Sequence, residues 1–310
     1  MTTRFDALTR PKAGDDFRAP SRFRSIGFAI AGVGLMLTMV TLIASVAAAN
    51  SDTESGATFA WSFGPTVLGF GTVKLAIGLV LMGILVRLWF RVTSVKDACA
   101  RLKPDAEAPA PRGTVQTEYG ECTETATSPR PLPIHRMART MWFPMLAMGY
   151  ILVAAGFVLS LVWSGKIEDG TQQAVQAWTQ GVQFLGEGML LAGISFLLGS
   201  ILAALREGGG EVQESHGLPV RTLKMPKTAK LFVAFMAAGL MVSMLQFILY
   251  IVAAGVTNPQ SFAAWSAWLG PFREFGLGML LTGIVLALVT IGNVLSFRFD
   301  RVREIITTGR

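Results

Sequence analysis

Four ionisable residues lie within or beside strongly apolar runs of this sequence, and they could carry its chemistry: Lys74, Glu187, Arg273 and Glu274. A charge in a membrane-spanning segment is costly, so it either pairs or marks the path of an ion or polar solute. Aligned on a motif shared by three of the runs, Arg273, Glu187 and Lys74 fall at positions four residues apart. Residues four apart share one face of a helix. We therefore predict a charged cluster at the centre of a helical bundle, in its outer-leaflet half.

Three roles are open to such a cluster. The charges could form ion pairs that hold the helices in register. They could instead form a gate or binding site for a small ion or polar solute. A third reading is that the long side chains only extend toward the membrane surface, where their charges meet water.

Other kinds of chemistry lack the necessary residues. The chain has only two histidines, His135 and His216, both outside the apolar runs, which excludes haem bound by paired histidines within the bundle. Cys99 and Cys122 match no metal-binding spacing, and the sequence contains no P-loop or nucleophile elbow. We expect no catalytic residue, no metal and no cofactor, and we expect that the protein is not an enzyme.

The apolar runs predict an integral membrane protein. The 310 residues are 52% apolar and 15% charged, with a mean hydropathy of +0.50. A helix needs about 20 apolar residues to cross a membrane. Six runs reach that length, at 26–49, 64–86, 141–164, 181–205, 231–256 and 275–297. The first could be a cleaved signal peptide, but its 24 uncharged residues exceed the roughly 7–15 of such a segment.

The positive residues predict the orientation. Of 27 Lys and Arg residues, 24 lie in the two tails and in the loops after the second and fourth runs. Such loops face the cytoplasm, so both termini are expected there, in a plasma (inner) membrane. Because the positive charge follows the ends of apolar runs, the net charge of +7 does not indicate a nucleic-acid partner. We expect contact with lipid, and with a membrane-protein partner or further copies of the chain.

These features divide the chain into seven segments. The loop between the second and third apolar runs, at 91–139, is rich in Pro, Ala and Thr. This composition predicts a flexible connector, and docking of a partner is the alternative. Gly208, Gly209 and Gly210 are predicted to end the fourth helix. The segments are a basic tail (1–24), a first helical hairpin (25–90), the flexible cytoplasmic loop (91–139), a second hairpin (140–205), a cytoplasmic loop (206–230), a third hairpin (231–297) and a cytoplasmic tail (298–310).

The second, fourth and sixth runs share a short motif. It reads LGFG at 68–71, LGEG at 185–188 and FGLG at 275–278. Weaker matches precede it at Gly34, Gly149 and Gly239, which lie 37, 39 and 39 residues before the second glycine of the motif that follows. We therefore predict an all-α fold of three tandem hairpins, which a pseudo-threefold axis along the membrane normal could relate.

Small residues and tryptophans recur with the motif. Small residues at a spacing of seven let helices approach closely in lipid, and we predict a packing seam at Gly69, Ala76 and Gly83, at Gly186, Gly193 and Ser200, and at Gly276, Gly283 and Thr290. A tryptophan stands ten residues before each second motif glycine, and interfacial anchoring is the expected role of Trp61, Trp178 and Trp268.

The sequence favours a multi-pass membrane protein that acts as a non-catalytic structural or accessory component of a membrane complex. The alternative is a channel or transporter for a small ion or polar solute. The inner halves of the runs are almost uniformly apolar, whereas a carrier needs polar groups near the midplane. This difference favours the structural role.

Overall fold

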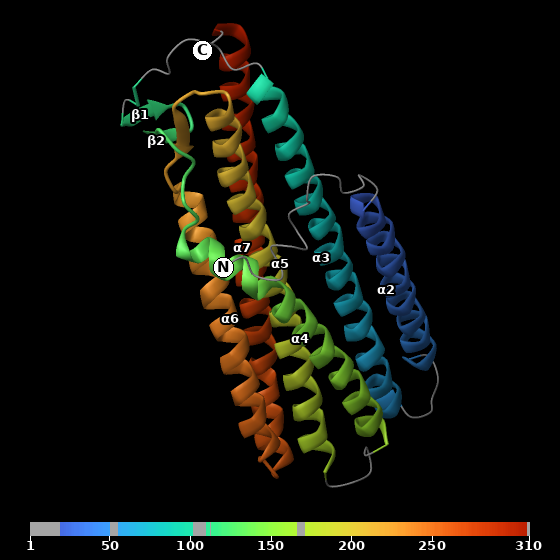
Figure 1. Ribbon diagram of the computed structural model, residues 1–310. Helices are drawn as coiled ribbons and strands as arrows, with labels where there is room; N and C mark the ends of the chain where they lie inside the picture. The colour runs from blue at the N-terminus through green and yellow to red at the C-terminus, as the bar shows by residue number, and fades with distance from the viewer. Residues whose placement is uncertain (1–18, 50–54, 102–109, 112, 166–170, 309–310) are drawn as a thin grey trace.

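The computed structural model describes residues 19–49, 55–101, 110–111, 113–165 and 171–308 (Figure 1). Six long helices account for most of them. They are α2 (Ala19–Ala49), α3 (Ser55–Arg101), α4 (Pro133–Ser164), α5 (Gln172–Ser215), α6 (Lys227–Ala254) and α7 (Pro259–Thr308).

All six helices are long and apolar enough to cross a membrane. Their outward faces carry large apolar side chains, such as Phe28 on α2 and Met241 on α6, each 66% exposed. In water such surfaces would be costly, but in a bilayer they meet hydrocarbon. The prediction of six apolar membrane helices is confirmed, and the protein is a multi-pass membrane protein.

The helices pack in an open row. α2 packs on α3; α3 packs also on α4 and α5; α5 packs also on α4, α6 and α7; and α6 packs on α7. α2 and α7, at the two ends of the row, make no extensive contact with each other. The described helices therefore do not form the closed ring that a threefold axis would produce. α5 is the most buried helix because it has neighbours on several sides.

Three short strands form a sheet at the end of the bundle where α7 ends (Figure 1). β1 (Thr114–Thr117) pairs with β2 (Gly120–Thr125), and β2 pairs with β3 (Val220–Leu223), both antiparallel. Gly120 has a φ of 122° where the β1–β2 hairpin turns, a conformation that glycine adopts without strain. The prediction of a flexible connector is therefore wrong for Thr114–Thr125, which pairs with a strand from the next loop.

α5 continues through its three glycines to Ser215, so the prediction that they end the helix is wrong. Each glycine admits a close neighbour instead. A Cβ atom on Gly208 would lie 2.6 Å from Cγ2 of Val92, and one on Gly209 would lie 2.3 Å from Cζ of Arg298. A Cβ atom on Gly210 would lie 2.7 Å from Cδ of Pro129. The glycines thus make room for α3, for α7 and for the chain that follows β2.

Candidate functional site

One pair of the predicted charged residues meets inside the bundle. Lys74 on α3 and Glu187 on α5 form an ion pair with 2.9 Å between Nζ and Oε1, and their side chains are 19% and 10% exposed. A buried charge without a partner is unstable, so each residue stabilises the other where it lies. The pair joins the first helical hairpin to the second.

Arg273 and Glu274 lie elsewhere in the same half of the bundle and pair with each other. The Arg273 guanidinium also lies 4.0 Å from the ring centroid of Phe184 on α5, a cation–π contact. No ion pair joins Arg273 to Glu187 among the described residues. The four charges therefore form two separate neutral pairs beside α5, and not one continuous cluster.

A buried amide near the ion pair was missed by the sequence analysis. Gln183 lies one turn before Glu187 on α5 and is 0% exposed. Neither its Nε2 nor its Oε1 atom has a hydrogen-bond partner among the described residues. Its uncharged side chain does not stand out in an apolar run, although its spacing of four from Glu187 places both on one helix face.

The predicted small-residue seam lies between the two helices of each hairpin. A Cβ atom on Gly69 would be 2.8 Å from the carbonyl oxygen of Gly34, and one on Gly186 would be 2.8 Å from that of Gly149. In the third hairpin a Cβ atom on Gly276 would meet a side chain, Cγ1 of Val242, at 2.7 Å. The first two hairpins thus bring their backbones together more directly than the third.

Further members of the seam occupy the same interfaces. A Cβ atom on Gly193 would lie 2.9 Å from the amide nitrogen of Leu146, and one on Gly283 would lie 3.5 Å from that of Met236. The Thr290 hydroxyl donates a hydrogen bond to Oγ1 of Thr228, at 2.9 Å. The remaining seam residues, Ala76, Gly83 and Ser200, are buried.

A second stripe of glycines, missed by the sequence analysis, joins one hairpin to the next. Gly64, Gly71 and Gly78 on α3 face Ser160, Val153 and Leu146 on α4, also at a spacing of seven. A Cβ atom on Gly71 would lie 2.8 Å from Cγ1 of Val153.

The same arrangement recurs between α5 and α6. There Gly181 faces Tyr250, and a Cβ atom on Gly188 would lie 2.5 Å from Oγ of Ser243. In the motif, therefore, the first glycine packs within its own hairpin and the second packs on the following hairpin.

In the third copy of the motif, no described helix packs on the second glycine. A Cβ atom on Gly278 of α7 would meet no described atom within 4 Å. Val285, seven residues further along α7, is 58% exposed. The face of α7 that corresponds to the interfaces on α3 and α5 is open.

The tryptophans face outward where the structure describes them. Trp178 on α5 is 41% exposed and Trp268 on α7 is 43% exposed. Trp268 also contacts Trp265, with 5.5 Å between ring centroids. The side chain of Trp61 lies outside the described residues.

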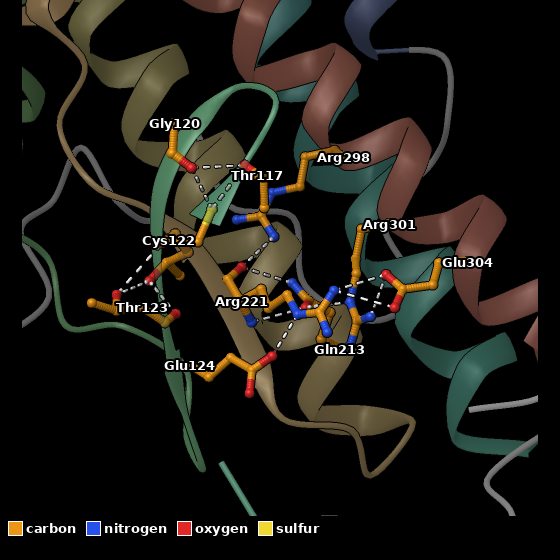
Figure 2. A network of polar contacts seen from close by, with 11 residues as sticks. Thr117, Gly120, Cys122, Thr123, Glu124, Gln213, Arg221, Arg298, Arg301 and Glu304 are labelled. Atoms are coloured by element: carbon orange, nitrogen blue, oxygen red, sulfur yellow. Dashed lines mark hydrogen bonds and ion pairs between the residues drawn. The ribbon is translucent and has the colours of Figure 1, made fainter. Parts of the chain in front are cut away.

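A polar network ties the sheet to the ends of α5 and α7 (Figure 2). Arg221 on β3 is its centre: its Nε donates to Oε1 of Glu124 on β2, at 2.5 Å, and its Nη1 donates to Oε2 of Glu304 on α7, at 3.0 Å. Burial alone would lower the pKa of Arg221, but the hydrogen bonds and charges of Glu124 and Glu304 raise it above its ordinary value. Arg221 therefore stays charged and holds two carboxylates from different elements.

Gln213 of α5 completes the network. Its Oε1 accepts from the amide of Arg221, at 3.0 Å, and its Nε2 donates to the carbonyl oxygen of Arg221, at 3.2 Å. Arg301 pairs with Glu304, with 2.5 Å between Nη1 and Oε2, and Arg298 donates from Nη2 to the carbonyl oxygen of Arg206, at 2.9 Å.

The described part of the chain contains no group of His, Cys, Asp and Glu residues able to hold a metal ion.

Comparison of the chain with protein-family models, with curated proteins and with solved structures found no match. The class of the protein, a multi-pass membrane protein, is therefore defined by its six apolar helices.

Proposed function

We propose that this protein is a non-catalytic structural component of a membrane assembly, built from three tandem hairpins and extended by contact between copies of itself. The observation that carries the proposal is the open glycine face of α7, because the same face is covered on α3 and on α5. α4 covers the first of these faces and α6 the second. The helix that corresponds to α4 and α6 at the start of the chain is α2.

The proposed occupant of the α7 face is α2 of a second copy. In the repeat, Thr38 on α2 corresponds to Val153 and Ser243, which are 0% and 3% exposed because each packs on a glycine of the preceding hairpin. Thr38 is only partly buried, and its Cγ2 contacts Gly69 of its own hairpin. Its outer side is therefore available to Gly278 of another copy. Contacts of this head-to-tail kind build chains, or rings where the rotation closes.

The ion pair supports a structural role over transport. Lys74 and Glu187 neutralise each other across two helices. Toward the sheet end, α5 continues with Leu190, Leu191, Ile194, Leu197 and Leu198, each no more than 4% exposed. Such packed apolar side chains give an ion no polar path, and the two buried serines of this stretch, Ser195 and Ser200, donate to carbonyl oxygens of their own helix.

The alternative, a channel or transporter, draws support from Gln183. Its unpartnered amide extends the polar site around Lys74 and Glu187 by one turn. If the site conducts, replacing Glu187 by Gln abolishes solute flux in proteoliposomes while the fold remains stable. If the pair is a lock, as we propose, neither form conducts and the variant loses stability.

The distribution of basic residues supports a location in the plasma (inner) membrane with both termini in the cytoplasm. The sheet then lies on the cytoplasmic side, where partners of the assembly can reach it.

The mass of the protein in mild detergent tests the assembly. We expect the wild type to form dimers and larger species, and Gly278→Leu to shift them toward the monomer. Gly32→Leu is the matched control, because Gly32 on α2 also has no neighbour within 4 Å but lies away from Thr38. A wild type that remains monomeric at every protein concentration in both detergent and nanodiscs would refute the proposal.

A further inference from the structure

A cavity lies between the second and third hairpins at the sheet end of the bundle. Its volume is about 100 Å³, and it is partly open to its surroundings. α4, α5, α6 and α7 line it, and Leu223 of β3 with Met225 and Pro226 covers its sheet end. Along α5 its lining runs from Ser195 to Arg206, which corresponds to roughly 16 Å of helix.

The cavity has an apolar body and a positively charged end. Most of its lining is apolar, with Phe232, Val233 and Met236 on the α6 side. Arg206 and Arg298 lie at the sheet end, and no Asp or Glu side chain lines the cavity.

The charged end has donors without partners. The Nε–H groups of Arg206 and Arg298 are buried and donate to no described residue, and Nδ1 of His135 on the α4 side is also buried and unpartnered. Arg298 is partly buried, and its Nη1 and Nη2 groups donate to the carbonyl oxygens of Arg221 and Arg206. Buried polar groups are normally hydrogen-bonded, so these groups indicate a missing partner. Because the two unpartnered Nε–H groups belong to positively charged guanidiniums, the partner is expected to be an anion.

The matching position between the first and second hairpins is filled. In the repeat proposed above, Gly199, Arg206 and Phe232 correspond to Met82, Trp89 and Trp142, which are 6%, 5% and 8% exposed. Ala229 likewise corresponds to Arg139, whose guanidinium lies 5.9 Å from the Trp89 ring centroid. The cavity thus exists because the bulky residues between the first and second hairpins are replaced by smaller residues between the second and third. The cavity itself does not depend on this comparison.

We propose that this cavity binds an anionic amphiphile of the membrane, with its hydrocarbon chain between α4 and α6 and its acidic head at Arg206 and Arg298. Lys227 and Lys230, in the first turn of α6 next to Pro226 and Ala229 of the lining, are exposed and add positive charge near the charged end. The N-terminal end of a helix also favours negative charge. An anionic phospholipid and a fatty acid share this chemistry, and both would reach the site from the bilayer.

Binding to the purified full chain in mild detergent tests the proposal. The probes are phosphatidylglycerol, phosphatidylcholine with the same chains, oleate and inorganic phosphate, with affinity measured from the thermal shift. We expect phosphatidylglycerol, oleate or both to bind, phosphatidylcholine to bind at least about tenfold more weakly, and phosphate alone to give no shift. Which of the two anionic probes binds identifies the source of the ligand.

Two classes of variant separate the head from the chain. Arg206→Gln removes one charge and is expected to weaken binding about tenfold. Gly199→Leu and Ala229→Leu fill the apolar body and are expected to weaken binding at least as much; the second serves where the first does not fold. Arg87→Gln, an exposed arginine on α3, is the control and leaves affinity unchanged. Equal binding of phosphatidylcholine, a full shift from phosphate alone, or unchanged affinity in either class of variant would overturn the proposal.

Discussion

At the scale of single residues, the paired charges stabilise the bundle because each charge offsets the free-energy cost of burying the other. Lys74 and Glu187 come from helices of different hairpins, so their attraction resists sliding of α3 along α5. The same argument applies to Arg221, which holds Glu124 and Glu304 together outside the apolar region. Losing one partner is then far more costly than losing both.

Removing one charge of the intramembrane pair is expected to destabilise the protein strongly. Lys74→Met leaves Glu187 buried without a partner, which costs about 3 kcal/mol of the free energy of unfolding. The double variant Lys74→Met with Glu187→Leu is expected to regain most of that loss. Reversible unfolding in mixed micelles measures both, and strictly additive losses would show that the two residues do not act as a pair.

Arg221 is expected to hold the sheet in place. Arg221→Met removes the guanidinium that pairs with Glu124, which is 6% exposed, and we expect about 3 kcal/mol of local destabilisation. Hydrogen exchange of Thr114–Thr125 measures it. Lys224→Gln is the matched control, because the Lys224–Glu121 pair is exposed at 47% and 40% and such pairs contribute about 1 kcal/mol or less. Equal exchange in the two variants would contradict the role of Arg221.

At the scale of elements, two stripes of small residues with different partners explain how the helices associate. One packs α3 on α2 and α5 on α4, and the other packs α3 on α4 and α5 on α6. α5 therefore has close neighbours on two faces. On α7, the second of these faces, which contains Gly278, has no neighbour among the described residues. In lipid, where apolar surface alone does not select a partner, such close approach does.

Leucine at two different glycines of the motif is therefore expected to have unequal effects on the stability of the single chain. Gly186→Leu places a side chain against the backbone of α4 and is expected to cost about 1–3 kcal/mol of the free energy of unfolding. Gly278→Leu meets nothing and is expected to change it by less than about 0.5 kcal/mol. Unfolding of the monomeric form measures both, and a larger loss at Gly278 would mean that another part of the chain covers this face of α7.

The helices could be predicted from the sequence because length and apolarity suffice for a membrane span. The spacing of the first motif glycines predicts close helix packing, but the sequence alone does not say which helix a glycine meets. For that reason Gly71 and Gly188 were not recognised as a second interface. The strands were missed because Thr114–Thr125 pairs with Val220–Leu223, nearly a hundred residues later, and no local pattern reveals such a partner.

At the scale of the whole molecule, the row of helices has two unlike ends, which the proposed head-to-tail contact would join. α2 is held by α3 alone among its extensive contacts, and α7 presents the glycine face that α4 and α6 cover elsewhere. In the proposed assembly, each added copy would make the same contact and would leave the same two ends free. Arg273 could not be placed from the sequence, because the sequence does not show that its guanidinium lies over the ring of Phe184 and pairs with the adjacent Glu274.

Disulfide formation between copies tests the central claim of head-to-tail assembly most directly. In a chain whose Cys99 and Cys122 are replaced by Ser, Thr38→Cys with Gly278→Cys is predicted to give a ladder of oxidised dimers and larger species in native membranes. Gly71→Cys with Val153→Cys is the positive control, since a Cβ on Gly71 lies 3.4 Å from that of Val153, close to the spacing of a disulfide. An efficient bond within the control chain, with no bond between copies for Thr38 and Gly278, would contradict the account.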